Sequence, residues 1–127
     1  MHTIDIPRKN WAKTLQAFSL MHEGWLISLE VLGPDLGAQQ ELHDLPLAEV
    51  VSERSERGDT ITISVARSAS GQLTHTIHRP TGVRIERTDE GADLALQIET
   101  ADGTTTILQF RTAALPETVD GIVRGRL

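Results

Sequence analysis

Cysteine is absent from this sequence of 127 residues. The chain therefore cannot form a disulfide framework, a thiolate metal site or a cysteine nucleophile. Long apolar runs are absent as well, so no segment has the length of a membrane-spanning helix. Asp5, Arg8 and Lys9 interrupt the region after Met1, where a secretory signal would be apolar. We therefore expect a cytoplasmic protein with no membrane partner.

Positive charge and aromatic side chains are also scarce. Lys and Arg number 12 against 18 Asp and Glu, which gives a net charge of −6. The aromatic side chains are Trp11, Phe18, Trp25 and Phe110. Surfaces that bind nucleic acid usually carry a basic face, and they stack bases on exposed aromatic rings. The composition therefore disfavours nucleic acid as a partner.

What the chain does contain is typical of one globular domain. Hydrophobic residues make up 39% of the sequence and charged residues 24%. A chain of 127 residues is long enough to bury a core without metal or disulfide cross-links. We therefore treat residues 1–127 as a single domain.

An amphipathic helix is predicted over residues 10–23. Asn10 is a suitable N-cap, and Gly24 suits the left-handed conformation that commonly ends a helix. Three apolar residues and one histidine recur between them at helical spacing: Trp11, Leu15, Phe18 and His22. A helix of this length is not stable alone, so it must pack on the rest of the chain.

Antiparallel strands are predicted from residue 25 to residue 111. The first, over residues 25–32, places four apolar side chains on one face: Trp25, Ile27, Leu29 and Val31. The turn at residues 33–37 sends the chain back as a more polar strand over residues 38–42. Pro46 lacks a backbone N–H, so it limits any strand that contains it to a sheet edge.

Alternating segments rich in threonine and β-branched residues continue the sheet beyond residue 59. These segments are residues 60–65, 73–78, 83–86, 94–99 and 106–110. The pattern predicts an α+β fold in which one N-terminal helix packs on a curved antiparallel sheet, or small barrel, of about six strands. The C-terminal tail, residues 113–127, is expected to dock through Leu115 and Val119.

The register of two hairpins follows from the position of the apolar side chains. A slip of one residue turns every side chain to the other face, so only three-residue loops keep the apolar faces together. The two loops end in Gly71 and Gly103, and both glycines should have a positive φ. Across the two hairpins, we expect Val65 to lie opposite His75 and Leu96 to lie opposite Leu108.

His75 is the first candidate site residue. It lies on the apolar face of its strand, near Val65, and a core histidine with one hydrogen bond is the favoured interpretation. The alternative is a small-ligand binder or enzyme that uses His75 in a pocket lined by the sheet. His78 lies three residues further along the strand, on the opposite face, so the two imidazoles cannot hold one metal ion.

His43 and Glu41 are the next candidates, because they share one face of the polar strand. They lack a third ligand, so no metal site and no cofactor are expected. His22 ends the predicted helix, where the helix dipole stabilises a protonated histidine. The sequence contains no phosphate-binding glycine loop, nucleophile elbow or zinc-binding histidine pair. Catalytic residues are therefore unknown, and no enzymatic activity is expected.

A surface for protein partners is predicted at the polar strand. The strand that contains Ala38 and Gln40 is hard to protect from pairing with another chain, which favours a homo-oligomer. Trp25 is a candidate interface anchor, although packing of the helix on the sheet is the favoured role for its ring.

Two motifs resemble those of a known family. One is the segment from His22 to Gln39, HEGWLISLEVLGPDLGAQ, and the other runs from Leu115 to Gly121, LPETVDG. Together they resemble a family of small bacterial proteins classed as a domain of unknown function. The resemblance implies no activity, cofactor or catalytic residue.

The sequence therefore favours a small cytoplasmic bacterial protein that acts as a binding or protein-interaction module without catalysis. A small-ligand binder or enzyme that uses His75 is the alternative. A small barrel that binds nucleic acid is a weaker alternative, which depends on analogy of fold alone.

Overall fold

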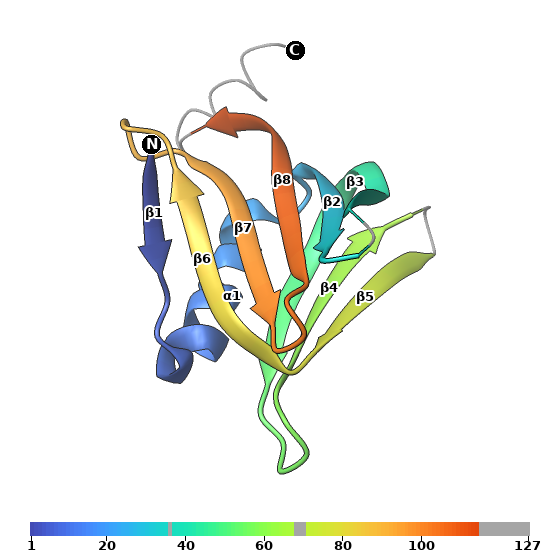
Figure 1. The fold of residues 1–127 in the computed structure, drawn as a ribbon. Coiled ribbons are helices and arrows are strands. Elements are labelled where there is room, and N and C mark those ends of the chain that lie inside the picture. The colour runs from blue at the N-terminus through green and yellow to red at the C-terminus, as the bar shows by residue number, and fades with distance from the viewer. Residues whose placement is uncertain (36, 68–70, 115–127) are drawn as a thin grey trace.

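The structure is a computed structural model that describes residues 1–35, 37–67 and 71–114. The described residues form eight strands and one α-helix, with a short 3₁₀ helix, η1, before the α-helix (Figure 1). Their bounds are β1 His2–Asp5, η1 Arg8–Asn10, α1 Trp11–His22, β2 Leu26–Gly33, β3 Gly37–Glu53, β4 Thr60–Ala66, β5 Gln72–His78, β6 Pro80–Arg87, β7 Asp93–Thr100 and β8 Thr105–Ala114.

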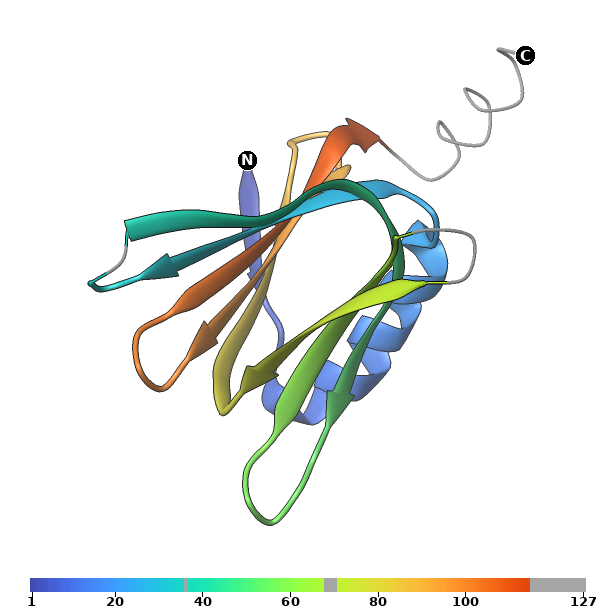
Figure 2. The ribbon, with the colours of Figure 1, turned by 90° about the vertical axis from the view of Figure 1, so that its right-hand side faces the viewer.

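The strands make one antiparallel sheet in the order β1-β6-β7-β8-β2-β3-β4-β5. Figure 2 shows that the sheet curls, so that β4 and β5 face the other strands across the interior. The sheet stays open, because β1 and β5 are its two outer strands and do not pair with each other. The prediction of an antiparallel sheet with one helix is confirmed.

The prediction of about six strands is wrong, because the sheet has eight. The short β1 was missed at the sequence level. Its four residues pair with β6, but only Ile4 is half-buried, so they carry too little apolar pattern to indicate a strand.

The long strand β3 joins the two halves of the curled sheet. It pairs with β2 as far as Pro46 and with β4 from Leu47 onward. Pro46 therefore lies where the strand changes neighbours and has one partner, which fits the expectation that it tolerates only an edge. As a result, each half of β3 has one edge that no strand of the described chain covers.

The helix α1 lies beside the second half of β3 and covers the core there. It begins at Trp11 and ends at His22, inside the predicted range, and Gly24 follows with a φ of +86°. Trp11, Leu15 and Phe18 are buried in one apolar cluster with residues of seven strands. The cluster members from the sheet include Ile27, Leu29, Leu47, Val50, Ile61, Ile63, Val65, Ile77, Val83, Ile85, Leu96, Ile98, Leu108 and Phe110.

The two predicted hairpin registers have different outcomes. Leu96 lies opposite Leu108, and Gly103 has a φ of +88°, so the second hairpin is as predicted. In the first hairpin Val65 pairs with Leu73 instead of His75. That prediction is wrong by two residues, because a shift of two keeps every side chain on its face and the apolar pattern cannot detect it.

Some expectations concern residues outside the described part of the chain. The predicted φ of Gly71 depends on residue 70, which lies outside the described residues, as do Leu115 and Val119 of the tail. Ala113 and Ala114 belong to β8, so the prediction that the tail begins at residue 113 is wrong by two residues. No helix among the described residues is long and apolar enough to cross a membrane.

Candidate functional site

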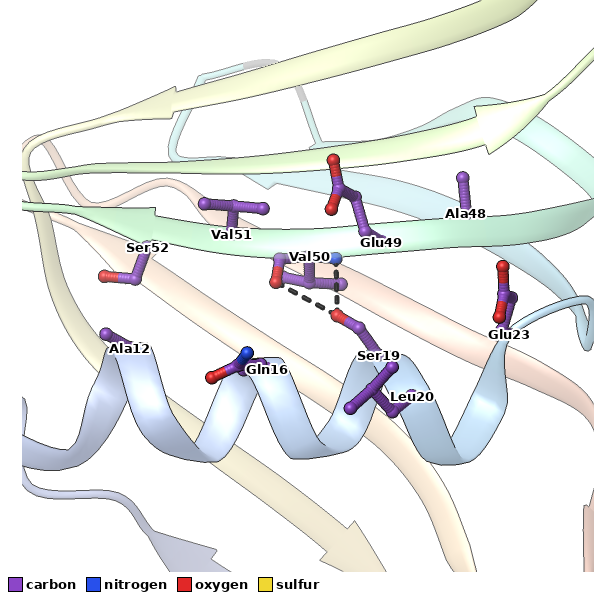
Figure 3. A pocket seen from close by; sticks show the side chains of 10 residues that line it. All are labelled: Ala12, Gln16, Ser19, Leu20, Glu23, Ala48, Glu49, Val50, Val51 and Ser52. Carbon is purple, nitrogen blue, oxygen red and sulfur yellow. Dashed lines mark hydrogen bonds between the residues drawn. The ribbon is translucent and has the colours of Figure 1, made fainter.

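A groove of about 440 Å³ runs between α1 and the second half of β3 (Figure 3). One wall consists of residues one helical turn apart, Ala12, Gln16 and Leu20, together with Ser19 and Glu23. The other wall is the run from Ala48 to Ser52. The groove exists because the helix covers the edge of β3 that no other strand takes.

Ser19 fastens the helix to that strand edge. Its hydroxyl oxygen accepts a hydrogen bond from the Val50 N–H at 2.7 Å (Figure 3). The same oxygen lies 3.0 Å from the Val50 carbonyl oxygen and 2.8 Å from the Leu15 carbonyl oxygen, so its single hydrogen can be donated to either. A buried serine thus takes the place of a neighbouring strand, which the helical pattern of the sequence did not indicate.

Replacing Ser19 by alanine is expected to lower the free energy of unfolding by about 2 kcal/mol, because the buried Val50 N–H would lose its acceptor. Ser52→Ala, on the opposite wall of the groove, is the matched control and should change that free energy by less than about 0.5 kcal/mol. Urea denaturation of the two variants measures the difference. Equal losses would contradict the anchoring role of Ser19.

The lining of the groove combines apolar side chains with two acidic ones. Leu20 is 73% exposed and, with Met1 and Met21, is among the large hydrophobic side chains on the surface of the described chain. Glu23 and Glu49 line the same groove, and the described residues that line it include no lysine or arginine. Leu20 lies off the apolar stripe of the helix, which is the sequence signal that could have indicated this surface.

A second polar cluster is buried where α1 ends. The ring of His22 is 1% exposed, and its Nδ1 lies 2.8 Å from the Phe18 carbonyl oxygen, to which it must donate. Its Nε2 lies 3.1 Å from an Asp93 carboxylate oxygen. Nε2 nevertheless has no well-directed hydrogen bond among the described residues. The contact with Asp93 is an ion pair only when the imidazole is protonated.

Arg87 completes this cluster, with its Nε 2.7 Å from the other Asp93 oxygen. Burial alone would raise the pKa of Asp93, but the contacts with His22 and Arg87 outweigh it and hold that pKa below its usual range. Phe18, Trp25 and Phe110 surround the His22 ring, with centroids 4.5 to 4.6 Å away. The cluster therefore ties the helix to β7 and β6.

Trp25, the predicted interface anchor, is half-buried in this structure. Its ring meets the His22 ring edge-on at 4.5 Å and the Phe110 ring at 5.2 Å. Ala38 and Gln40 are exposed on the first half of β3, opposite Leu32 and Glu30 of β2. The other edge of that half pairs with no strand of the described chain, so self-association there stays a prediction.

The three predicted ligand-binding residues do not meet. His75 is half-buried and lines a pocket of about 230 Å³ beside the β7–β8 turn, whose lining includes neither His43 nor Glu41. Those two are exposed on β3, where His43 Nδ1 lies 3.2 Å from the Ser28 hydroxyl. Within the described ranges, no three acidic or histidine side chains are grouped so that they could hold a metal ion.

Comparison with known proteins places the chain in a family without assigning an activity. It matches no curated protein and no solved structure. Residues 2–118 match the model of a family of unknown function, DUF5335. The chain belongs to that family.

Proposed function

We propose that this member of a family of unknown function is a protein-interaction module without catalytic activity, and that the groove between α1 and β3 binds its partner. The observation that carries the proposal is the exposed Leu20 side chain in a groove whose only charged groups, among the described residues, are Glu23 and Glu49. Exposed apolar side chains with a polar surround commonly mark a binding surface.

The negative charge of the groove favours a partner segment that carries basic side chains. A segment with an apolar side chain can cover Leu20, Ala48 and Val51. Lysine or arginine on either side of that residue would lie near Glu23 and Glu49. Because the whole chain has a net charge of −6, its long-range field also attracts a basic segment.

The edge of β3 favours an extended conformation for that segment. Val50 turns its N–H and C=O toward Ser19. Backbone groups two residues apart on a strand face the same side, so Ser52 presents its own N–H and C=O there. No backbone hydrogen bond outside the β3–β4 ladder engages them in the described chain. An extended peptide can hydrogen-bond the Ser52 groups, while the Val50 groups stay engaged by Ser19.

Selection from a random peptide library on the full chain tests this proposal. The enriched peptides are expected to share an apolar residue flanked by lysine or arginine. The double variant Glu23→Lys, Glu49→Lys should bind them at least about tenfold more weakly, which corresponds to the loss of one or two charge pairs. The control Glu56→Lys, Glu90→Lys makes the same change of net charge on exposed residues outside the groove.

Added salt should weaken the wild-type interaction, because exposed charge pairs are screened. Failure to enrich any peptide, or enrichment of acidic sequences, would overturn the proposal. Equal weakening by the groove variant and the control variant would also overturn it, since the effect would then arise from net charge alone.

A further inference from the structure

The pocket that contains His75 differs from the groove in its position and in its charge. It lies at one end of the curled sheet, between the end of β5 and the turn that joins β7 to β8. His75 shares the inner face of β5 with the buried Ile77. His78 and Arg79 line the same pocket and are exposed. The pocket therefore has an apolar inner side, and the exposed Arg79 and Asp102 place one charge of each sign at its rim.

Threonine hydroxyls, which can donate hydrogen bonds, are numerous around this pocket. Four threonine hydroxyls line it: Thr76, Thr100, Thr104 and Thr106. The acid in the lining, Asp102, already accepts hydrogen bonds from the Thr100 hydroxyl and from the Thr104 N–H. These bonds, and more weakly the charge of Arg79, hold the pKa of Asp102 below its usual range. Asp102 is therefore held by its own turn through one carboxylate oxygen, and Arg79 is the cationic group of the lining.

Arg79 stands in a backbone conformation that arginine rarely adopts. Its φ is +53°, in the left-handed region that favours glycine. The Arg79 N–H donates to the Asp59 carbonyl oxygen at 3.1 Å, and the Ala101 N–H donates to the Arg79 carbonyl oxygen at 3.2 Å. In the part of the chain that the structure describes, its guanidinium forms no ion pair. Strain of this kind is often found where a side chain serves a ligand.

We propose that this pocket binds a small organic anion through its carboxylate or phosphate group. Arg79 supplies the planar guanidinium that matches such groups, His75 contacts the ligand from the inner face, and threonine hydroxyls other than that of Thr100 orient it. The volume of about 230 Å³ equals that of roughly eight water molecules, which limits the ligand to about the size of a simple metabolite. The pocket has no residue in common with the α1–β3 groove, so this proposal is independent of the proposed function.

Arg79→Gly is the variant that separates binding from folding. Glycine adopts a φ of this sign without strain, so the variant should unfold no more easily than the wild type while it lacks the guanidinium. Arg57→Gly, an exposed arginine outside the pocket, is the matched control. His75→Gln tests the second contact and keeps a polar side chain of similar reach.

Two-dimensional NMR of the full chain, titrated with inorganic phosphate, with succinate and with sodium chloride, is the test. We expect saturable shifts at residues 75–79 and 100–106 with phosphate, with succinate or with both, and none with chloride. Phosphate alone would identify a phosphorylated ligand, and succinate alone a carboxylate. Arg79→Gly should weaken the interaction by about tenfold or more, and Arg57→Gly should leave it unchanged. The absence of saturable shifts, or equal binding by Arg79→Gly, would overturn the proposal.

Discussion

Replacing Leu15 by alanine is expected to lower the free energy of unfolding by about 3 kcal/mol. Leu15 is 0% exposed and lies in the apolar cluster that joins α1 to the sheet. Removing most of its side chain leaves a cavity, and a helix of 12 residues cannot compensate by its own stability. The loss should be seen as a lower midpoint in urea denaturation with an unchanged slope.

Leu20→Ala, on the same helix, is the matched control. Leu20 is 73% exposed, so the same substitution should change the free energy of unfolding by less than about 0.5 kcal/mol. If both variants lost the same stability, the helix would not pack with the face that the structure shows.

Replacing Asp93 by asparagine is expected to cost about 3 kcal/mol of folding free energy at neutral pH, because it removes the buried carboxylate that pairs with Arg87 and contacts the His22 ring. Asp5→Asn is the control. Asp5 also contacts an arginine, with Arg84 Nε at 2.9 Å, but its side chain is 82% exposed, so its loss should cost less than about 1 kcal/mol. Thermal and urea denaturation of both variants measure the difference.

The lowered pKa of Asp93 also predicts how the stability of the fold depends on pH. The pKa of Asp93 in the folded chain lies below its usual value, so the ionised group stabilises the fold at every pH above about 4. That contribution is lost as the pH falls through the lowered pKa, below about pH 4. The difference in stability between the wild type and Asp93→Asn should therefore shrink on acidification. A difference that stays constant to low pH would contradict the buried ion pair.

The elements that the sequence predicted correctly are those with a strong local pattern. The helix follows from apolar residues at helical spacing, and the β7–β8 register follows from a face that must be buried as a whole. The inward position of His75 follows from alternation along its strand. Even the error in the first hairpin kept each residue on its face, because the shift was of two residues.

The parts that could not be predicted depend on contacts between segments distant in the sequence. His22 reads as a helix end and Asp93 as the end of a polar turn, and only the fold brings them within 3.1 Å. The hydroxyl of Ser19 has no visible role until an uncovered strand edge lies beside it. Likewise, nothing local indicates the positive φ of Arg79, since glycine is the residue that this conformation favours.

The claim that the α1–β3 groove binds a basic, extended peptide is tested most directly by the affinity of a selected peptide for Leu20→Asp. This change places a charge where the apolar residue of the peptide should pack. Met21→Asp is its control, because Met21 is also exposed and adjacent in sequence but does not line the groove. Fluorescence polarisation should show binding at least about tenfold weaker for Leu20→Asp and unchanged for Met21→Asp. Equal affinity of Leu20→Asp and the wild type would contradict the claim.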